Sequence, residues 1–110
     1  NVLIFGAGDT GEMAIREIKR NKSLNYNPVG FLDDDLFKLG NKIQGIPVIG
    51  SRQDLARLVA EHQVKEVLIA IPSIALEDCS QIVRLCNGCG VPYRNIKGIL
   101  DAELFSPPLL

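Results

Sequence analysis

The 110-residue sequence has no tryptophan, a single histidine and little excess charge of either sign. Its 12 Lys and Arg residues are balanced by 13 Asp and Glu residues, and the formal net charge is −1. This balance provides no basic face for nucleic acid or anionic lipid. No apolar run approaches the roughly 18 residues that span a bilayer. We therefore expect no nucleic-acid partner and no membrane contact by this segment.

Cysteine is also scarce, and its pattern argues against metal or redox chemistry. Cys79, Cys86 and Cys89 are an odd number, which favours a reducing, cytoplasmic location. Cys86 and Cys89 have the C-x-x-C spacing, but a zinc site needs four ligands, and a redox pair needs its first cysteine at a helix N-terminus. The only histidine, His62, ends an apolar helical stripe. We expect the cysteines to pack in the core and His62 to be a half-buried helix-terminal residue, and we expect no metal.

The sequence is rich in short apolar runs that alternate with helical patterns. Apolar runs predict five strands, at residues 2–5, 29–32, 47–49, 66–71 and 91–96. Helical patterns begin at residue 11 and cover about 52–62 and 76–88. This alternation predicts an α/β fold, a Rossmann-like doubly wound parallel sheet with strand order 3-2-1-4-5. Pro47 cannot donate a ladder hydrogen bond, so we place the third strand at the sheet edge.

The first strand leads into a glycine-rich turn with the spacing Gly6-x-Gly8-x-x-Gly11. In a dinucleotide-binding turn, Gly6 permits a sharp bend, Gly8 lets the backbone approach a phosphate, and Gly11 allows the helix to pack closely. Asp9 and Thr10 lie inside the turn, where Thr10 either contacts a phosphate or caps the helix. We predict that backbone amides of residues 6–11 bind a diphosphate at the helix N-terminus.

An acidic triplet follows the second strand and supplies the other half of the predicted site. Asp33 lies 22 residues after Gly11, near the roughly 20-residue spacing of the acid that binds a ribose diol. Asp34 is a further candidate contact, although a solvated turn explains Asp34 and Asp35 equally simply. Ser73, after the fourth strand, either closes the crevice near the switch point or caps the next helix.

These residues predict a coenzyme preference but no catalytic centre. A carboxylate at Asp33 repels a phosphorylated ribose, so NAD(H) should bind in preference to NADP or CoA. Tyr93 and Lys97 have the spacing of the Tyr/Lys pair of short-chain dehydrogenases. In a strand, however, the two side chains would lie about 13 Å apart, so we regard the match as coincidence and predict no catalytic residue.

Four motifs in the same order give the sequence a family resemblance. They occupy residues 6–13, 27–35, 42–50 and 67–73. With them the chain resembles the N-terminal nucleotide-binding domain, often called CoA-binding-like, of bacterial membrane-anchored nucleotide-sugar epimerases and dehydratases of polysaccharide biosynthesis. UDP-sugar 4,6-dehydratases and UDP-D-quinovosamine 4-dehydrogenases are of this type. In them the domain follows transmembrane helices and precedes a short-chain-dehydrogenase-type domain that holds NAD(P).

The resemblance implies a non-catalytic domain of a larger NAD(P)-dependent enzyme, at the cytoplasmic face of the inner membrane. We expect residues 1–99 to form this domain, residues 100–110 to begin a linker to the catalytic domain, and the protein to be a homo-oligomer that binds a nucleotide or nucleotide sugar. Two alternatives remain. One is the UDP-sugar-binding domain of a sugar acyltransferase or sugar-phosphate transferase, although such acyltransferases usually have Gly-His in place of Asp9-Thr10. The other is a scaffold domain with a vestigial pocket.

Overall fold

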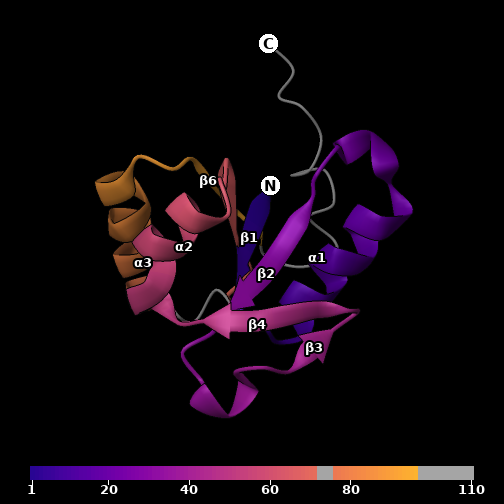
Figure 1. Ribbon diagram of the computed structural model, residues 1–110, viewed down its shortest axis with the longest axis horizontal. Coiled ribbons are helices and arrows are strands. Elements are labelled where there is room, and N and C mark those ends of the chain that lie inside the picture. Colours follow the sequence, from indigo (N-terminus) through magenta and orange to yellow (C-terminus); the bar gives the residue numbers. More distant parts are fainter. Residues whose placement is uncertain (72–75, 97–110) are drawn as a thin grey trace.

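A computed structural model describes residues 1–71 and 76–96, and only the backbone of residues 76–79. It is a three-layer α/β arrangement, with a six-stranded sheet between helices on both faces (Figure 1). The sheet order is β3-β4-β2-β1-β5-β6. The strands are β1 Val2–Phe5, β2 Pro28–Leu32, β3 Lys42–Ile43, β4 Ile46–Gly50, β5 Glu66–Ile69 and β6 Tyr93–Asn95. This confirms the predicted Rossmann-like class, and β6 is shorter than the predicted fifth strand.

In the described residues, three α-helices connect the strands, and three short 3-10 turns accompany them. The α-helices are α1 Asp9–Arg20, α2 Leu55–Glu61 and α3 Leu76–Cys89. The 3-10 turns are η1 Lys22–Leu24, η2 Leu36–Lys38 and η3 Arg52–Asp54. The expected capping box before α2 is present, since the Ser51 amide donates to the Asp54 carboxylate at 2.9 Å and the Ser51 side chain accepts in return. The helix α1 begins two residues earlier than its periodicity indicates.

The five parallel strands β4-β2-β1-β5-β6 have the predicted order 3-2-1-4-5, and the structure adds one strand outside them. β3 pairs antiparallel with β4, so the prediction that the strand containing Pro47 forms the sheet edge is wrong. The connecting turn is Gln44-Gly45, in which both residues have positive φ, 52° and 83°, as a type I′ hairpin turn requires. Next to Pro47, the Val48 amide donates to the Asn41 carbonyl at 2.8 Å.

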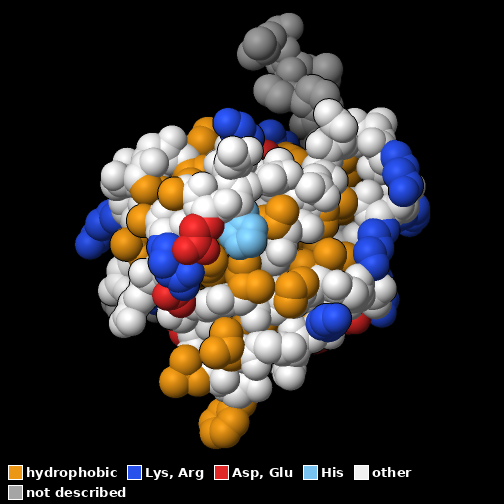
Figure 2. All heavy atoms as spheres, viewed as in Figure 1, with side chains coloured by type: hydrophobic (Ala, Val, Ile, Leu, Met, Phe, Trp, Pro, Cys, Tyr) orange, Lys and Arg blue, Asp and Glu red, His pale blue; other side chains and the backbone are white. Residues whose placement is uncertain are grey.

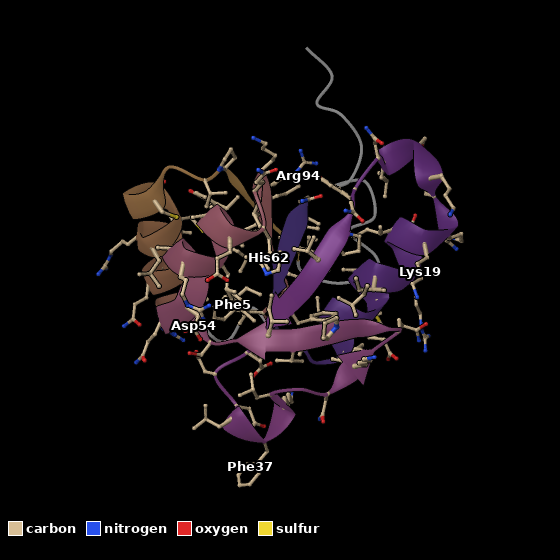
Figure 3. All side chains as sticks on the ribbon, viewed as in Figure 1. Phe5, Lys19, Phe37, Asp54, His62 and Arg94 are labelled. Carbon is tan, nitrogen blue, oxygen red and sulfur yellow. The ribbon has the colours of Figure 1, made fainter. Side chains whose placement is uncertain are left out.

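The hairpin turn between β3 and β4 also contacts α1. The Gln44 side chain donates to the Glu12 carboxylate at 3.3 Å. The Lys19 ammonium donates to the Gln44 carbonyl, and Figure 3 shows Lys19 reaching from α1 toward this turn. These contacts fasten the edge of the sheet to the helix that starts at the glycine turn.

The core has two parts because residues of each strand alternate between the faces of the sheet. In β1, Val2 and Ile4 pack with α1, whereas Leu3 and Phe5 pack with α2 and α3. Both faces of β1 are buried, which explains its uninterrupted apolar sequence. The carboxyl ends of β1 and β2 therefore lie side by side, and they place the glycine turn next to Asp33.

Cys86 and His62, for which the sequence predicts no catalytic or metal-binding role, occupy structural positions. Cys86 is a free thiol fully buried in the α3 core, as expected for packing, and burial raises its pKa to about 11. His62 is the half-buried C-cap of α2. The Cys79 side chain, Lys97 and the predicted linker 100–110 lie outside the described residues. In the described part of the chain, no helix has the length and apolar character needed to cross a bilayer.

Candidate functional site

Two glycines of the turn after β1 are required by the fold itself. Gly6 has φ +112°, and a Cβ built on it would lie 2.4 Å from the Ala70 carbonyl oxygen. A Cβ on Gly11 would lie 2.0 Å from the Gly6 carbonyl oxygen and 3.0 Å from the Phe31 ring. Gly6 therefore permits the turn beside β5, and Gly11 permits α1 to pack closely on the sheet, as predicted.

Gly8 is different, because nothing in the described part of the protein requires its lack of a side chain. Its φ of −99° is open to any L-residue. A Cβ at this position would meet no atom of residues 1–71 and 76–96 within 4 Å. Gly8 is exposed and leaves open space directly at the start of α1.

The first turn of α1 presents backbone donors to this space. Gly8 is the N-cap residue, its carbonyl accepts from the Glu12 amide at 3.0 Å, and no side chain caps the helix. The prediction that Thr10 could be the N-cap is therefore wrong, since Thr10 lies within the first turn. Among the described residues, the amides of residues 8–11 have no acceptor. Such amides, together with the positive end of the helix dipole, favour an anion.

Asp33 lies at the carboxyl end of β2 and braces this turn. Its Oδ2 accepts from the Ala7 amide at 2.8 Å, and its Oδ1 accepts from the Asp35 amide at 2.8 Å. The Lys38 ammonium lies 3.6 Å from Oδ2, and the Asp33 side chain is 16% exposed. The carboxylate therefore faces the glycine turn, and each oxygen retains a lone pair for a further donor.

The other two carboxylates of the acidic triplet have protein partners. Asp34 accepts from the Arg52 amide at 3.2 Å and from its Nε at 2.7 Å. Asp35 is the N-cap of η2 and accepts from the Phe37 amide at 3.0 Å. Each oxygen of Asp34 thus already binds Arg52, so its predicted contact with a cofactor would have to share that ion pair. The predicted contact Ser73 lies outside the described residues.

Arg52 is a residue of this region that the sequence analysis did not single out. Its guanidinium lies 5.9 Å from the centre of the Phe5 ring, at the end of β1, and it donates to Gln81 of α3 at 2.5 Å. It also borders an open groove of about 370 Å³ between η3 and α3. The groove is lined by Arg52, Gln53, Gln81, Arg84 and Leu85. Arg52 thus joins three segments, because it pairs with Asp34 after β2, packs on Phe5 at the end of β1 and donates to Gln81 of α3.

The η2 segment exposes large apolar side chains near the carboxyl ends of β1 and β2. Leu36, Phe37 and Leu39 are 75%, 95% and 56% exposed. In Figure 1 this segment extends below the carboxyl ends of β1 and β2, and Figure 2 shows apolar side chains clustered at this end. Phe37 marks its tip in Figure 3. Within residues 1–71 and 76–96, no cluster of three or more His, Cys, Asp or Glu side chains could hold a metal ion.

The sequence matches a known protein family. A family model described as a CoA-binding domain matches residues 1–96. The chain belongs to the CoA-binding domain family. This confirms the resemblance inferred from the four motifs.

Relatives of this family member include proteins of two kinds. The capsular polysaccharide biosynthesis protein CapD of Staphylococcus aureus is 34% identical over 106 residues, which cover 93% of this chain and 18% of CapD. The redox-sensing transcriptional repressor Rex of Desulforamulus reducens is 35% identical over 83 residues, 76% of this chain and 39% of Rex. The chain thus spans less than a fifth of CapD and about two fifths of Rex.

Solved structures resemble the CoA-binding domain over most of its length. UDP-D-quinovosamine 4-dehydrogenase from Vibrio fischeri superposes with a TM-score of 0.79 and 30% identity, covering 91% of this chain and 80% of that chain. The repressor RSP in complex with β-NADH has a TM-score of 0.74 over 87% of this chain and 45% of that chain. At 21% identity, the RSP structure shows only that the fold is shared.

Proposed function

We propose that the chain is the nucleotide-binding, non-catalytic domain of an NAD(P)-dependent nucleotide-sugar dehydratase, epimerase or 4-dehydrogenase of bacterial surface polysaccharide biosynthesis. The observation that carries the proposal is the open space at Gly8 in front of the amides of residues 8–11. A diphosphate placed there would accept hydrogen bonds from donors that have no acceptor among the described residues. A side chain at residue 8 would occupy that space.

Asp33 completes the proposed site. Its carboxylate is held against the turn by the Ala7 amide, and its remaining lone pairs would accept from the hydroxyl groups of the adjoining ribose. Because the hydrogen bond from the Ala7 amide already fixes the Asp33 carboxylate, little side-chain entropy would be lost when a ligand binds. Thr10 would add a hydroxyl near the phosphates, and Asp9 would have to point away from them, as its exposed position allows.

The coenzyme that we propose is NAD(H), in preference to NADP or CoA. The negative charge of Asp33 disfavours a phosphate on the ribose. The chain is 35% identical to the redox-sensing repressor Rex over 83 residues, and RSP, a Rex-family repressor, has a structure with β-NADH; the relationship to Rex supports NAD(H) over the CoA that gives the family its name. We propose no nucleic-acid partner for this segment, because its formal net charge is −1.

A non-catalytic role is supported by the position of the only histidine. The His62 carbonyl accepts from the Asn1 side chain at 2.7 Å, before the start of β1 and thus at the edge opposite to the glycine turn. The likeness to CapD and to UDP-D-quinovosamine 4-dehydrogenase supports a role in nucleotide-sugar chemistry. We propose that the parent enzyme is a homo-oligomer with this domain at the cytoplasmic face of the membrane, where nucleotide sugars are made.

Isothermal titration of the 110-residue chain with NAD⁺, CoA and a UDP-sugar tests the proposal. NAD⁺ should bind, and Gly8→Ala should weaken it at least tenfold, because the added methyl group would contact the diphosphate. Gly88→Ala is the matched control, since a Cβ there also meets no atom within 4 Å but lies at the end of α3. It should leave NAD⁺ affinity unchanged.

Other outcomes would contradict the proposal in distinct ways. If none of the three ligands binds, the pocket is vestigial and the domain is a scaffold. If Gly8→Ala and Gly88→Ala bind NAD⁺ equally well, the nucleotide does not occupy the glycine turn. Tighter binding of the UDP-sugar than of NAD⁺ would instead favour the sugar-binding domain of an acyltransferase or sugar-phosphate transferase.

A further inference from the structure

Lys38 provides a positive charge beside the predicted ribose-binding carboxylate. Its ammonium lies 3.6 Å from Asp33 Oδ2, and its side chain is 36% exposed. Lys38 is the last residue of η2, whose first turn is capped by Asp35. The Asp35 carbonyl accepts from the Lys38 amide at 3.0 Å, so the backbone that carries the ammonium is fixed by the acidic triplet itself.

This pair changes the charge that a ribose would meet. Asp33 alone presents one negative charge, which repels a phosphate group and accepts from hydroxyl groups. With an ammonium at 3.6 Å, the pair is close to neutral overall. The ammonium is also exposed enough to swing toward an incoming anion, since only part of its stem is covered.

Another cation near the turn is already engaged. Arg52 contributes its amide and Nε to Asp34, and its Nη1 donates to Gln81. Moving its guanidinium to a ligand would break these bonds and leave Asp34 without its counter-ion. Within the described part of the chain, the Lys38 ammonium has one charged contact, with Asp33, at a distance longer than a normal hydrogen bond, and it can be redirected at lower cost.

We infer that Lys38 sets the discrimination of the site between a ribose with free hydroxyl groups and a ribose that carries a phosphate. The inference rests on the proposed nucleotide site. In this arrangement Asp33 accepts from the hydroxyl groups of NAD(H), and Lys38 offsets the repulsion that Asp33 would exert on the 2′-phosphate of NADP or the 3′-phosphate of CoA. The site thus prefers NAD(H), but only by a margin that the ammonium keeps small.

The experiment compares NAD⁺ and NADP⁺, which differ only in the 2′-phosphate, on the same protein. Titration calorimetry of the 110-residue chain gives the ratio of the dissociation constants, NADP⁺ over NAD⁺. Lys38→Met removes the charge and keeps most of the stem. It should raise the ratio about five- to tenfold at low salt, and the rise should shrink as salt screens the exposed charges. CoA should follow NADP⁺, because its adenosine also carries a ribose phosphate.

Lys42→Met is the matched control for the loss of one positive charge. Lys42 is an exposed residue of β3, on the same connection between β2 and β4. It should leave the ratio within twofold of that of the unmodified chain.

Three results would overturn the inference. An unchanged ratio in Lys38→Met, with both nucleotides still binding, refutes the role of Lys38 and leaves the proposed site intact. An equal rise in Lys42→Met means that net charge, and not the pair with Asp33, controls the preference. If no nucleotide binds the unmodified chain, the proposed function fails and the inference fails with it.

Discussion

Replacing Gly11 by alanine should destabilise the fold much more than replacing Gly8, although both belong to one motif. In Gly11→Ala the new Cβ would lie 2.0 Å from the Gly6 carbonyl oxygen, and an ordinary contact begins at 3.4 Å. The start of α1 would have to move by about 1.4 Å from the turn. Because the neighbour is backbone, no flexible side chain can absorb the change. We expect the free energy of unfolding to fall by about 3 kcal/mol or more.

Gly8→Ala adds the same methyl group without a contact. Its φ of −99° suits alanine, and no atom lies within 4 Å of the new Cβ. Alanine also restricts the unfolded chain, which on its own stabilises a protein by about 0.4–1 kcal/mol. Gly8 is the N-cap, where glycine is somewhat preferred to alanine, so the two effects oppose each other. We expect a net change within about 1 kcal/mol.

Urea unfolding followed by far-ultraviolet circular dichroism measures both variants, since the sequence has no tryptophan for fluorescence. A Gly11→Ala protein as stable as the unmodified chain would show that α1 does not need its close approach to the turn. A loss of several kcal/mol in Gly8→Ala would show that Gly8 serves the fold. The second result would remove the main observation behind the proposed nucleotide site.

Three further predictions concern residues around the site and in the core. Arg52→Met should lower the free energy of unfolding by about 1–2 kcal/mol. A double-mutant cycle with Asp34→Asn should show a coupling energy of only about 1 kcal/mol, because the ion pair is partly exposed to solvent. Cys86 should react with iodoacetamide at pH 8 at least tenfold more slowly in the folded protein than in urea, as mass spectrometry can measure, because burial raises its pKa to about 11. Burial and a hydrogen bond to Glu66 raise the pKa of Tyr26 from 10.0 to about 12, so its contribution to stability is complete below pH 10 and is lost from pH 10 to 12. The free energy of unfolding, measured in urea, should therefore depend less on pH over that range in Tyr26→Phe than in the unmodified chain.

The parts of the structure that the sequence predicts are those set by local chemistry. Apolar runs identify the central strands β1, β2 and β5 because strands buried largely on both faces carry few polar residues, whereas β6 is exposed at Tyr93 and Asn95. The roles of Gly6 and Gly11 follow from backbone geometry, since the turn requires a positive φ at one and a close approach at the other. Ser51 and Asp54 predict the start of the next helix, because a capping box is formed by residues close together in the sequence.

The parts that the sequence does not predict depend on contacts between distant segments. β3 has only two residues, too few for periodicity, although Gln44-Gly45 occupies the turn positions of its hairpin. The pairing of Asp34 with Arg52 joins residues 18 apart, and neither position indicates the other. Lys38 belongs to η2, whose short 3-10 turn has no apolar pattern that would orient its side chain toward Asp33.

The acidic triplet shows why a motif match alone does not establish a binding site. Asp33 braces the glycine turn through the Ala7 amide, Asp34 holds Arg52, and Asp35 caps η2. Selection for folding could therefore maintain all three carboxylates without any ligand. The same is true of Gly6 and Gly11, which the packing of β1, β5 and α1 already requires. Among the described residues, no contact requires Gly8 to lack a side chain and the amides of residues 8–11 have no acceptor, so the case for a nucleotide depends on them more than on the complete motif.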